Sequence, residues 1–125
     1  MEKVIADGLA RLPSFSHAVI TGQMIHVSGT LGTVGETMDL VGGGTGPQTT
    51  QVIRNIERVL EAAGAGLDQV VKVNVYLSDM STFQEMNEAY LVEFGDDPPA
   101  RITIGGVDLA LGAAVEIDCI AYLGA

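Results

Sequence analysis

Apolar residues along the chain follow two different periods, one typical of helices and one typical of strands. From Gln51 to Ala63, apolar residues recur at intervals of three and four with polar residues between them, and Gly64 follows the run. A second segment of this kind runs from Ser81 to Gly95, where Ser81 and Gln84 have the spacing of a capping box. These patterns predict two amphipathic helices, each covering another layer with one side only.

Strict alternation marks the predicted strands. In the segment 71–78, valine and leucine alternate with more polar residues, which predicts a strand with an aliphatic face and a mixed polar face. Ala18–Thr21 and Met24–Ser28 are predicted to form a hairpin that turns at Gly22-Gln23.

The end of the chain contains two more alternating segments. Ala100–Ile104 and Ala113–Leu123 are predicted to pair with each other as a hairpin around the turn region 105–112. The whole order of elements indicates a single α+β domain over residues 1–125, in which one sheet has two helices on one face.

The second face of this predicted sheet has an intermediate polarity. It is too apolar for a fully hydrated surface and too polar for a closed core, so an interface between copies of the chain is the natural interpretation. The residues expected on it are Lys72, Asn74, Tyr76, Ile120 and Tyr122.

The register of the predicted last hairpin decides which polar side chains meet. If the aliphatic residues of both strands face the helices, Arg101 lies opposite Glu116, and Thr103 and Asp118 project from the same uncovered face. A shift by one residue would turn each side chain of a strand to the other face. The pairs of this register are Ile102 with Val115 and Ile104 with Ala113.

The residue types in this group suggest a chemistry. A guanidinium is a rigid fork that matches a carboxylate, so Arg101 is a good anchor for a small carboxylic acid. Glu116 could then orient or deprotonate a water molecule. From the spacing alone, a plain cross-strand ion pair between the two residues is an equally good interpretation.

Composition narrows the partners. Six Lys+Arg residues against sixteen Asp+Glu give a net charge of −10, which disfavours nucleic acid and anionic membrane surfaces as partners. The sequence has no apolar run long enough to span a bilayer and no signal-peptide pattern. A single cysteine, Cys119, permits no internal disulfide, and together these features favour the cytoplasm.

Other chemical candidates are weaker. The glycine-rich run 42–46 lacks the Lys-Ser/Thr of a phosphate-binding loop and is interpreted as a flexible loop. His17 and His26 have no third ligand at metal spacing, so no metal site is expected. Cys119 is predicted to lie on the aliphatic face as a small buried residue.

The residues singled out above also form a known pattern. In this order along the chain, several segments resemble the Rid family, the YjgF-like reactive-intermediate (imine) deaminases, and the resemblance covers essentially the whole sequence. The segments that carry it are Ser14–Val19, Val27–Gly29, Gln51–Ile56, Glu61–Gly64, Lys72–Asp79, Met86–Tyr90, Pro99–Arg101 and Glu116–Ala121.

The resemblance implies a fold, an assembly and a reaction. It implies a chorismate-mutase-like fold in a homotrimer with a central barrel and active sites between subunits. The implied reaction is hydrolysis of 2-imino or enamine acids to 2-oxo acids and ammonia, without a cofactor. Arg101 would hold the substrate carboxylate and Glu116 would position the water. The further substrate-binding positions are Phe15, Ser28, Gly29, Asn87 and Thr103.

Three places in the sequence depart from the family pattern. Phe15 stands where many relatives have tyrosine, and Thr103 where they often have cysteine or serine. Leu111-Gly112 replaces the usual Leu-Pro before the final strand. These departures leave two alternatives open. One is a Rid-like protein that binds small carboxylates, or has a regulatory role, without turnover. The other is a deaminase of one pathway, acting on aminomuconate-type or aminoacrylate-type compounds.

Overall fold

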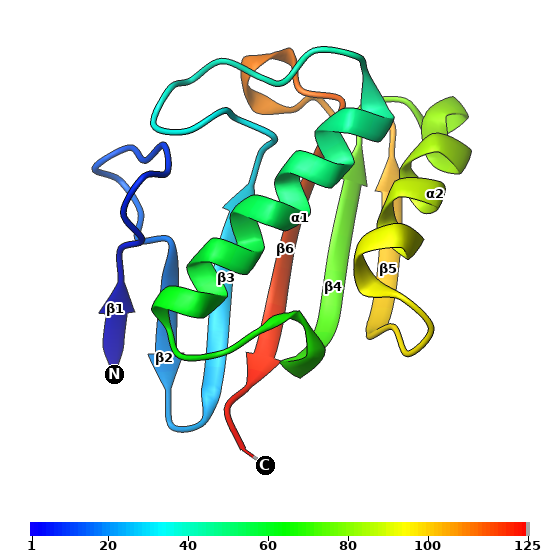
Figure 1. The fold of residues 1–125 in the computed structure, drawn as a ribbon. Helices are drawn as coiled ribbons and strands as arrows, with labels where there is room; N and C mark the ends of the chain where they lie inside the picture. Colours follow the sequence, from blue (N-terminus) through cyan, green and yellow to red (C-terminus); the bar gives the residue numbers. More distant parts are fainter. Residues whose placement is uncertain (125) are drawn as a thin grey trace.

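One mixed sheet with two α-helices on one face forms the fold (Figure 1). A computed structural model describes residues 1–124, and the predicted α+β class is confirmed. The six strands follow the order β1-β2-β3-β6-β4-β5. Their bounds are β1 (Glu2–Val4), β2 (Ala18–Thr21), β3 (Met24–Thr30), β4 (Val70–Leu77), β5 (Ala100–Gly105) and β6 (Val115–Tyr122), and the helices are α1 (Thr45–Ala62) and α2 (Phe83–Phe94).

Both helices lie where the periodicity predicts them, with different beginnings. α1 starts at Thr45, before the predicted Gln51. Pro47 lies in its first turn, where the missing backbone N–H of proline breaks no helical hydrogen bond and its ring holds φ near the helical value. The predicted capping box of Ser81 is wrong. Ser81 belongs to a short 3₁₀ turn before α2, and its backbone N–H donates to the Asp79 carboxylate at 2.9 Å.

The predicted last hairpin is also wrong, because β5 and β6 are not neighbours. β5 runs parallel to β4, with Arg101 beside Val73, and α2 forms the crossover between these two strands. β6 lies between β3 and β4, with Glu116 beside Tyr76. The connection 106–114 therefore passes over the end of β4, where Ser78 N–H donates to the Ala114 carbonyl at 3.1 Å.

The faces of β5 are the reverse of the prediction. Ile102 and Ile104 are 49% and 42% exposed and lie on the face without helices. Arg101 and Thr103 point to the helix-covered side, where Arg101 contacts α2. The physical reason is that α2 offers aromatic rings and an amide over this edge strand, which suit a guanidinium better than an aliphatic side chain.

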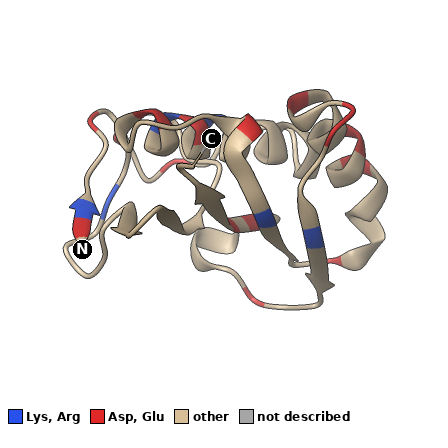
Figure 2. Cartoon of the chain, turned by 90° about the horizontal axis from the view of Figure 1, so that it is seen from below, with Lys and Arg blue, Asp and Glu red and all other residues tan. Residues whose placement is uncertain are grey.

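The core lies between α1 and the central strands. Figure 2, viewed along the layers, shows the helices packed on one side of the sheet. α1 buries an aliphatic stripe that includes Ile53, Ile56 and Leu60, and the covered face of the sheet supplies Val73 and Ile117 among others. Burial of this kind is worth about 1.5–3 kcal/mol for each large aliphatic side chain.

The opposite face of the sheet carries the side chains expected there. Lys72, Asn74, Tyr76 and Ile120 are half-buried and Tyr122 is exposed, all on the face away from the helices. In β4 the predicted aliphatic face fails only at Val71, which is 45% exposed because the register shifts between Val70 and Lys72.

No helix within residues 1–124 is both long enough and apolar enough to cross a membrane.

Cys119 is buried on the covered face of β6, as predicted. Burial, and then the charge of Asp118, raise the pKa of its thiol to about 12. Because the thiolate is the reactive form, we expect no reaction of the folded protein with a water-soluble aromatic disulfide at pH 8. The same protein in denaturant should release one equivalent of aromatic thiol, and a comparable release without denaturant would contradict this burial.

Candidate functional site

Glu116 lies half-buried on the face of the sheet without helices, next to the end of β3. The β3–β6 register is irregular between Val27 and Thr30, and this brings Gly29 against the Glu116 side chain. A Cβ atom at Gly29 would collide with the Glu116 carboxylate. Glycine at this position therefore leaves the room in which the carboxylate sits.

A cleft of about 440 Å³ opens beside this carboxylate. Four of the predicted site residues meet in it: Phe15, Ser28, Gly29 and Glu116. Its other walls are mainly aliphatic, and they are Leu12, Leu31, Met38, Ala110 and Leu111.

Ser28 fixes the N-terminal wall of the cleft. Its hydroxyl donates to the Ser16 carbonyl at 2.6 Å, and its backbone N–H donates to the His17 carbonyl at 2.9 Å. These bonds hold the segment that carries Phe15 beside β3. Ser28 thus acts on the shape of the cleft, while its own hydroxyl proton is already used.

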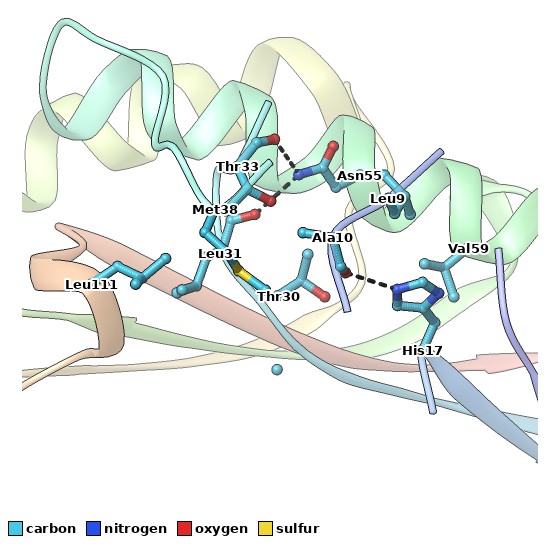
Figure 3. A pocket seen from close by; sticks show the side chains of 11 residues that line it. Leu9, Ala10, His17, Thr30, Leu31, Thr33, Met38, Asn55, Val59 and Leu111 are labelled. Atoms are coloured by element: carbon cyan, nitrogen blue, oxygen red, sulfur yellow. Dashed lines mark hydrogen bonds between the residues drawn. The ribbon is translucent and has the colours of Figure 1, made fainter. Parts of the chain in front are cut away.

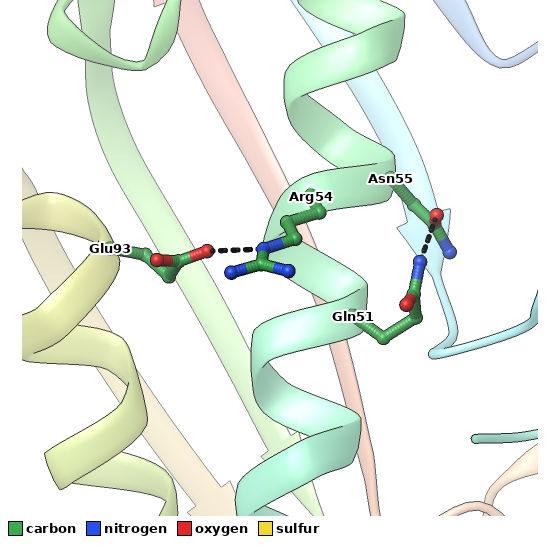
Figure 4. Close-up of polar contacts among 4 residues, drawn as sticks. All are labelled: Gln51, Arg54, Asn55 and Glu93. Atoms are coloured by element: carbon green, nitrogen blue, oxygen red, sulfur yellow. Dashed lines mark hydrogen bonds and ion pairs between the residues drawn. The ribbon is translucent and has the colours of Figure 1, made fainter.

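Asn55 of α1 fixes the loop that follows β3. Its side-chain N–H groups donate to the carbonyls of Leu31 and Thr33 at 3.0 Å, and its Oδ1 accepts from Gln51 at 2.9 Å (Figure 4). The side chain that carries this network is buried. The loop wall of the cleft is therefore tied to the helix layer.

A polar cluster borders Glu116 on its other side. Asn74 donates to one carboxylate oxygen of Asp118 at 2.6 Å, and the Tyr76 hydroxyl donates to the other at 3.3 Å. A second cleft, of about 380 Å³, contains Gly29 and Glu116 together with Tyr76, Asp108 and Asp118. Glu116 therefore stands between a mainly aliphatic cleft and an acidic one.

Burial and charge both act on the carboxyl group of Glu116. Burial, and then the negative charge of Asp118, raise its pKa above the ordinary value. Burial and Asp118 also raise the pKa of Tyr76. A carboxyl group with a raised pKa beside a cleft is suited to proton transfer nearer neutral pH than an ordinary glutamate.

Arg101 lies in a different cleft, of about 330 Å³, between β5 and α2. Its Nη1 donates to Asn87 Oδ1 at 2.9 Å. Its guanidinium carbon lies 4.7 Å from the centre of the Tyr90 ring and 5.6 Å from that of Phe83. Contacts of this kind between a cation and a ring face hold a guanidinium in one orientation.

The guanidinium of Arg101 keeps donors free for a ligand. Within residues 1–124, no carboxylate lies within 4.0 Å of the guanidinium. The ion pair that those residues form joins Arg54 and Glu93 at 3.1 Å and does not involve Arg101 (Figure 4). Near Arg101, the hydroxyls of Tyr90 and Thr103 are buried without a hydrogen-bond partner in that part of the chain. Thr103, a predicted binding residue, thus lies on the side of Arg101.

The prediction that Arg101 lies opposite Glu116 is wrong. β4 separates their strands by roughly 10 Å at the usual strand spacing, and their partners on β4, Val73 and Tyr76, are three positions apart. Their side chains project from opposite faces, so they line different clefts within one protomer. A cross-strand ion pair between them is excluded as well.

Sequence reasoning missed the contribution of Tyr90 to the arginine site. Asn87 and Tyr90 are three residues apart in the predicted second helix, and residues at this spacing share one helix face. That spacing, together with the position of Tyr90 in the resemblance, was the available signal. His17 has a structural role: Ala6 N–H donates to His17 Nδ1 at 2.9 Å, and His17 Nε2 lies 3.0 Å from the Ala10 carbonyl.

We expect Gly29→Ala to slow a reaction that uses the Glu116 carboxylate by roughly 10²-fold in kcat/KM, because a misplaced reacting group costs about this much. The added methyl must push the Glu116 carboxylate aside. Gly29 does not have a left-handed φ, so the thermal midpoint should stay close to that of the wild type.

The matched control is Gly42→Ala, which adds the same methyl group where no atom lies within 4 Å. Steady-state kinetics and thermal unfolding should show full activity for this variant. Equal activity of the two variants would show that the position of Glu116 is not critical.

Comparison with known proteins identifies the family. A family model described as Endoribonuclease L-PSP matches residues 6–123. The solved structure of RidA from an Antarctic Psychrobacter bacterium is similar with a TM-score of 0.91 and 36% identity, over 98% of this chain and 99% of that one. The chain belongs to the Rid family.

Two animal relatives match this chain over almost its whole length. The RutC family protein UK114 of Drosophila melanogaster is 39% identical over 126 residues, or 99% of this chain and 91% of the fly protein. A rat protein named 2-iminobutanoate/2-iminopropanoate deaminase is 35% identical, over 99% of this chain and 92% of its own. The predicted family is confirmed, and these names support deamination chemistry within it.

Proposed function

We propose that this protein hydrolyses 2-imino acids, or the enamine acids that isomerise to them, to 2-oxo acids and ammonia. The reaction adds water to the C=N carbon of R–C(=NH)–COO⁻ and then expels ammonia, which leaves R–CO–COO⁻. The observation that carries the proposal is a pair of complementary groups. Arg101 has free donors for a carboxylate, and Glu116, with its raised pKa, can accept a proton from a water molecule.

Each group has a defined task in this reaction. The Arg101 fork holds the substrate carboxylate and thereby fixes the C=N carbon in place. The Glu116 carboxylate accepts a proton from the attacking water and can later return it to the leaving nitrogen. A protonated imine is already strongly electrophilic, so orientation and one proton carrier account for most of the catalysis needed.

Because the two groups line separate clefts in one protomer, we propose that each complete site forms between two copies of the chain in a homotrimer. Arg101 of one copy would then reach the Glu116 cleft of the next. The face without helices supports this assembly, because it carries the exposed Ile102, Ile104 and Tyr122. A head-to-tail contact that closes into a ring is one of the standard solutions for such surfaces.

The direct test supplies the substrate in place. An L-amino acid oxidase converts alanine or 2-aminobutyrate to the 2-imino acid, and semicarbazide traps the imine that remains. The protein should decrease the trapped imine and speed ammonia release, and the Arg101→Ala variant should not. Binding of 2-oxo acids without any faster loss of imine would instead favour the binding-protein alternative.

Complementation tests the shared site. Arg101→Ala and Glu116→Gln should each lose about 10²-fold or more in activity, whereas a trimer assembled from both at equal amounts should recover about a quarter of the sites by random mixing. The two variants are unfolded and refolded together, and activity is compared with that of separately refolded samples. No recovery in a verified mixed oligomer would overturn the shared site.

The family model's description refers to an endoribonuclease, and we do not propose that activity for this chain. A net charge of −10 repels a phosphate backbone. The basic positions are scattered over the chain and do not gather into one surface patch (Figure 2).

A further inference from the structure

A second, smaller pocket lies behind the cleft that holds Glu116. It has a volume of about 80 Å³ and lies between the N-terminal segment, the end of β3 and α1. Figure 3 shows Leu111 at one end of it and Val59 and His17 at the other, with Met38 and Leu31 between. The cleft and the pocket share four lining residues, which are Gly29, Leu31, Met38 and Leu111.

The polar groups along this pocket are largely engaged within the protein. Three of its four polar side chains have hydrogen bonds: His17 through both ring nitrogens, Asn55 through its amide, and Thr30 to the Ser28 carbonyl at 2.8 Å. The fourth is Thr33, whose carbonyl accepts from Asn55. A space lined in this way offers a polar ligand little to bind and suits an apolar group.

Met38 and Leu111 line both the cleft and the pocket and stand between them. Met38 is 44% exposed and has three rotatable bonds in a polarisable side chain, which adapts easily to a neighbour. Leu111 has a left-handed backbone conformation with φ of 61°, and its side chain is 52% exposed. A group held beside Glu116 can therefore extend past these two side chains into the pocket.

The volume limits the size of that group. An apolar cavity of about 150 Å³ accepts benzene, so about half that volume suits three or four carbon atoms. An isopropyl or isobutyl group fits this limit, and a phenyl ring exceeds it. We propose that the pocket receives the branched aliphatic side chain of the substrate, so that the preferred substrates are 2-imino acids of the valine and leucine type. This inference rests on the proposed function and adds a substrate class to it.

The test compares three imines, formed in place from alanine, leucine and phenylalanine. The leucine-type imine carries three more carbons than the alanine type, and each buried carbon is worth about fourfold, which corresponds to about 0.8 kcal/mol. We therefore expect kcat/KM to be about 60-fold higher for the leucine type than for the alanine type. The phenylalanine type should fall below the leucine type.

Two variants test the place of the side chain. Ala10→Leu puts an isobutyl group into the pocket, and the leucine-to-alanine ratio of kcat/KM should fall at least tenfold. Met38→Ala, on an exposed position that tolerates the change, should raise kcat/KM for the phenylalanine type. Val92→Ala, which truncates a side chain that is 80% exposed on α2 and outside both spaces, should leave every ratio as in the wild type.

The outcomes separate this inference from the proposed function. If no imine is hydrolysed faster than without the protein, the proposed function fails and the inference fails with it. If all three are hydrolysed with similar kcat/KM, or the alanine type is fastest, only the inference is overturned. A leucine preference that neither Ala10→Leu nor Met38→Ala alters would also overturn it, because another part of the site would then select the side chain.

Discussion

Replacing Arg101 by alanine is expected to lower kcat/KM for a 2-imino acid by about 10²–10³-fold, because a desolvated guanidinium–carboxylate contact is worth roughly 2–5 kcal/mol. Asn87 and Tyr90 already hold the guanidinium in place, so the Arg101 side chain loses little further conformational entropy when the substrate binds. Arg101→Lys should also lose most of the activity, since an ammonium group lacks the planar fork.

Arg54 provides the matched control for Arg101. It forms an ion pair with Glu93 at 3.1 Å, and its side chain is 64% exposed (Figure 4). Arg54→Ala removes the same charge from the protein and should leave kcat/KM unchanged. Steady-state kinetics of both variants, with thermal unfolding to verify the fold, make the comparison. Similar small losses in the two would show that Arg101 acts only through net charge.

Local sequence patterns predicted the helices, most strands and the mixed character of the uncovered face. These features depend on residues close in the chain, and alternation assigns side chains to two faces wherever the strand is central, as in β4 and β6. The buried position of Cys119 followed from the same alternation.

Alternation could not show which face of β5 is covered. Ile102 and Ile104 alternate with Arg101 and Thr103 in either orientation, and the assumption that aliphatic residues face inward failed at this edge strand. The predicted pairing of β5 with β6 failed for a related reason. Successive strands usually pair, whereas here β4 inserts between β5 and β6 through contacts distant in sequence.

The site could be predicted as a set of residues but not as an arrangement. The resemblance selected Phe15, Ser28, Gly29 and Glu116, which meet in one cleft, and Arg101 and Asn87, which meet in another. A linear motif does not say that a sheet lies between two of its members. The aliphatic pocket behind Met38 was not predicted either, because its walls come from four segments with no common pattern.

Replacing Glu116 by glutamine is expected to lower kcat/KM by about 10²–10⁴-fold, the usual contribution of a positioned proton carrier. Glutamine keeps the size of the side chain but cannot take a proton from water. In the wild type, kcat/KM should rise with pH as the carboxylate forms, with a midpoint above the ordinary pKa of a glutamate because burial and Asp118 raise that pKa.

Asp118 supplies the decisive variant, because its charge acts on the Glu116 carboxyl from the neighbouring acidic cluster. A nearby negative charge disfavours ionisation, so its removal in Asp118→Asn lowers the Glu116 pKa, and the acid limb of the pH profile should move to lower pH. Glu61→Gln removes a charge from an exposed position on α1 and should leave the limb in place. A limb that stays fixed in Asp118→Asn, or that persists in Glu116→Gln, would mean that another group governs the proton transfer. The shift separates a catalytic carboxylate from one that only shapes the cleft, because a structural role would change the rate at all pH values alike.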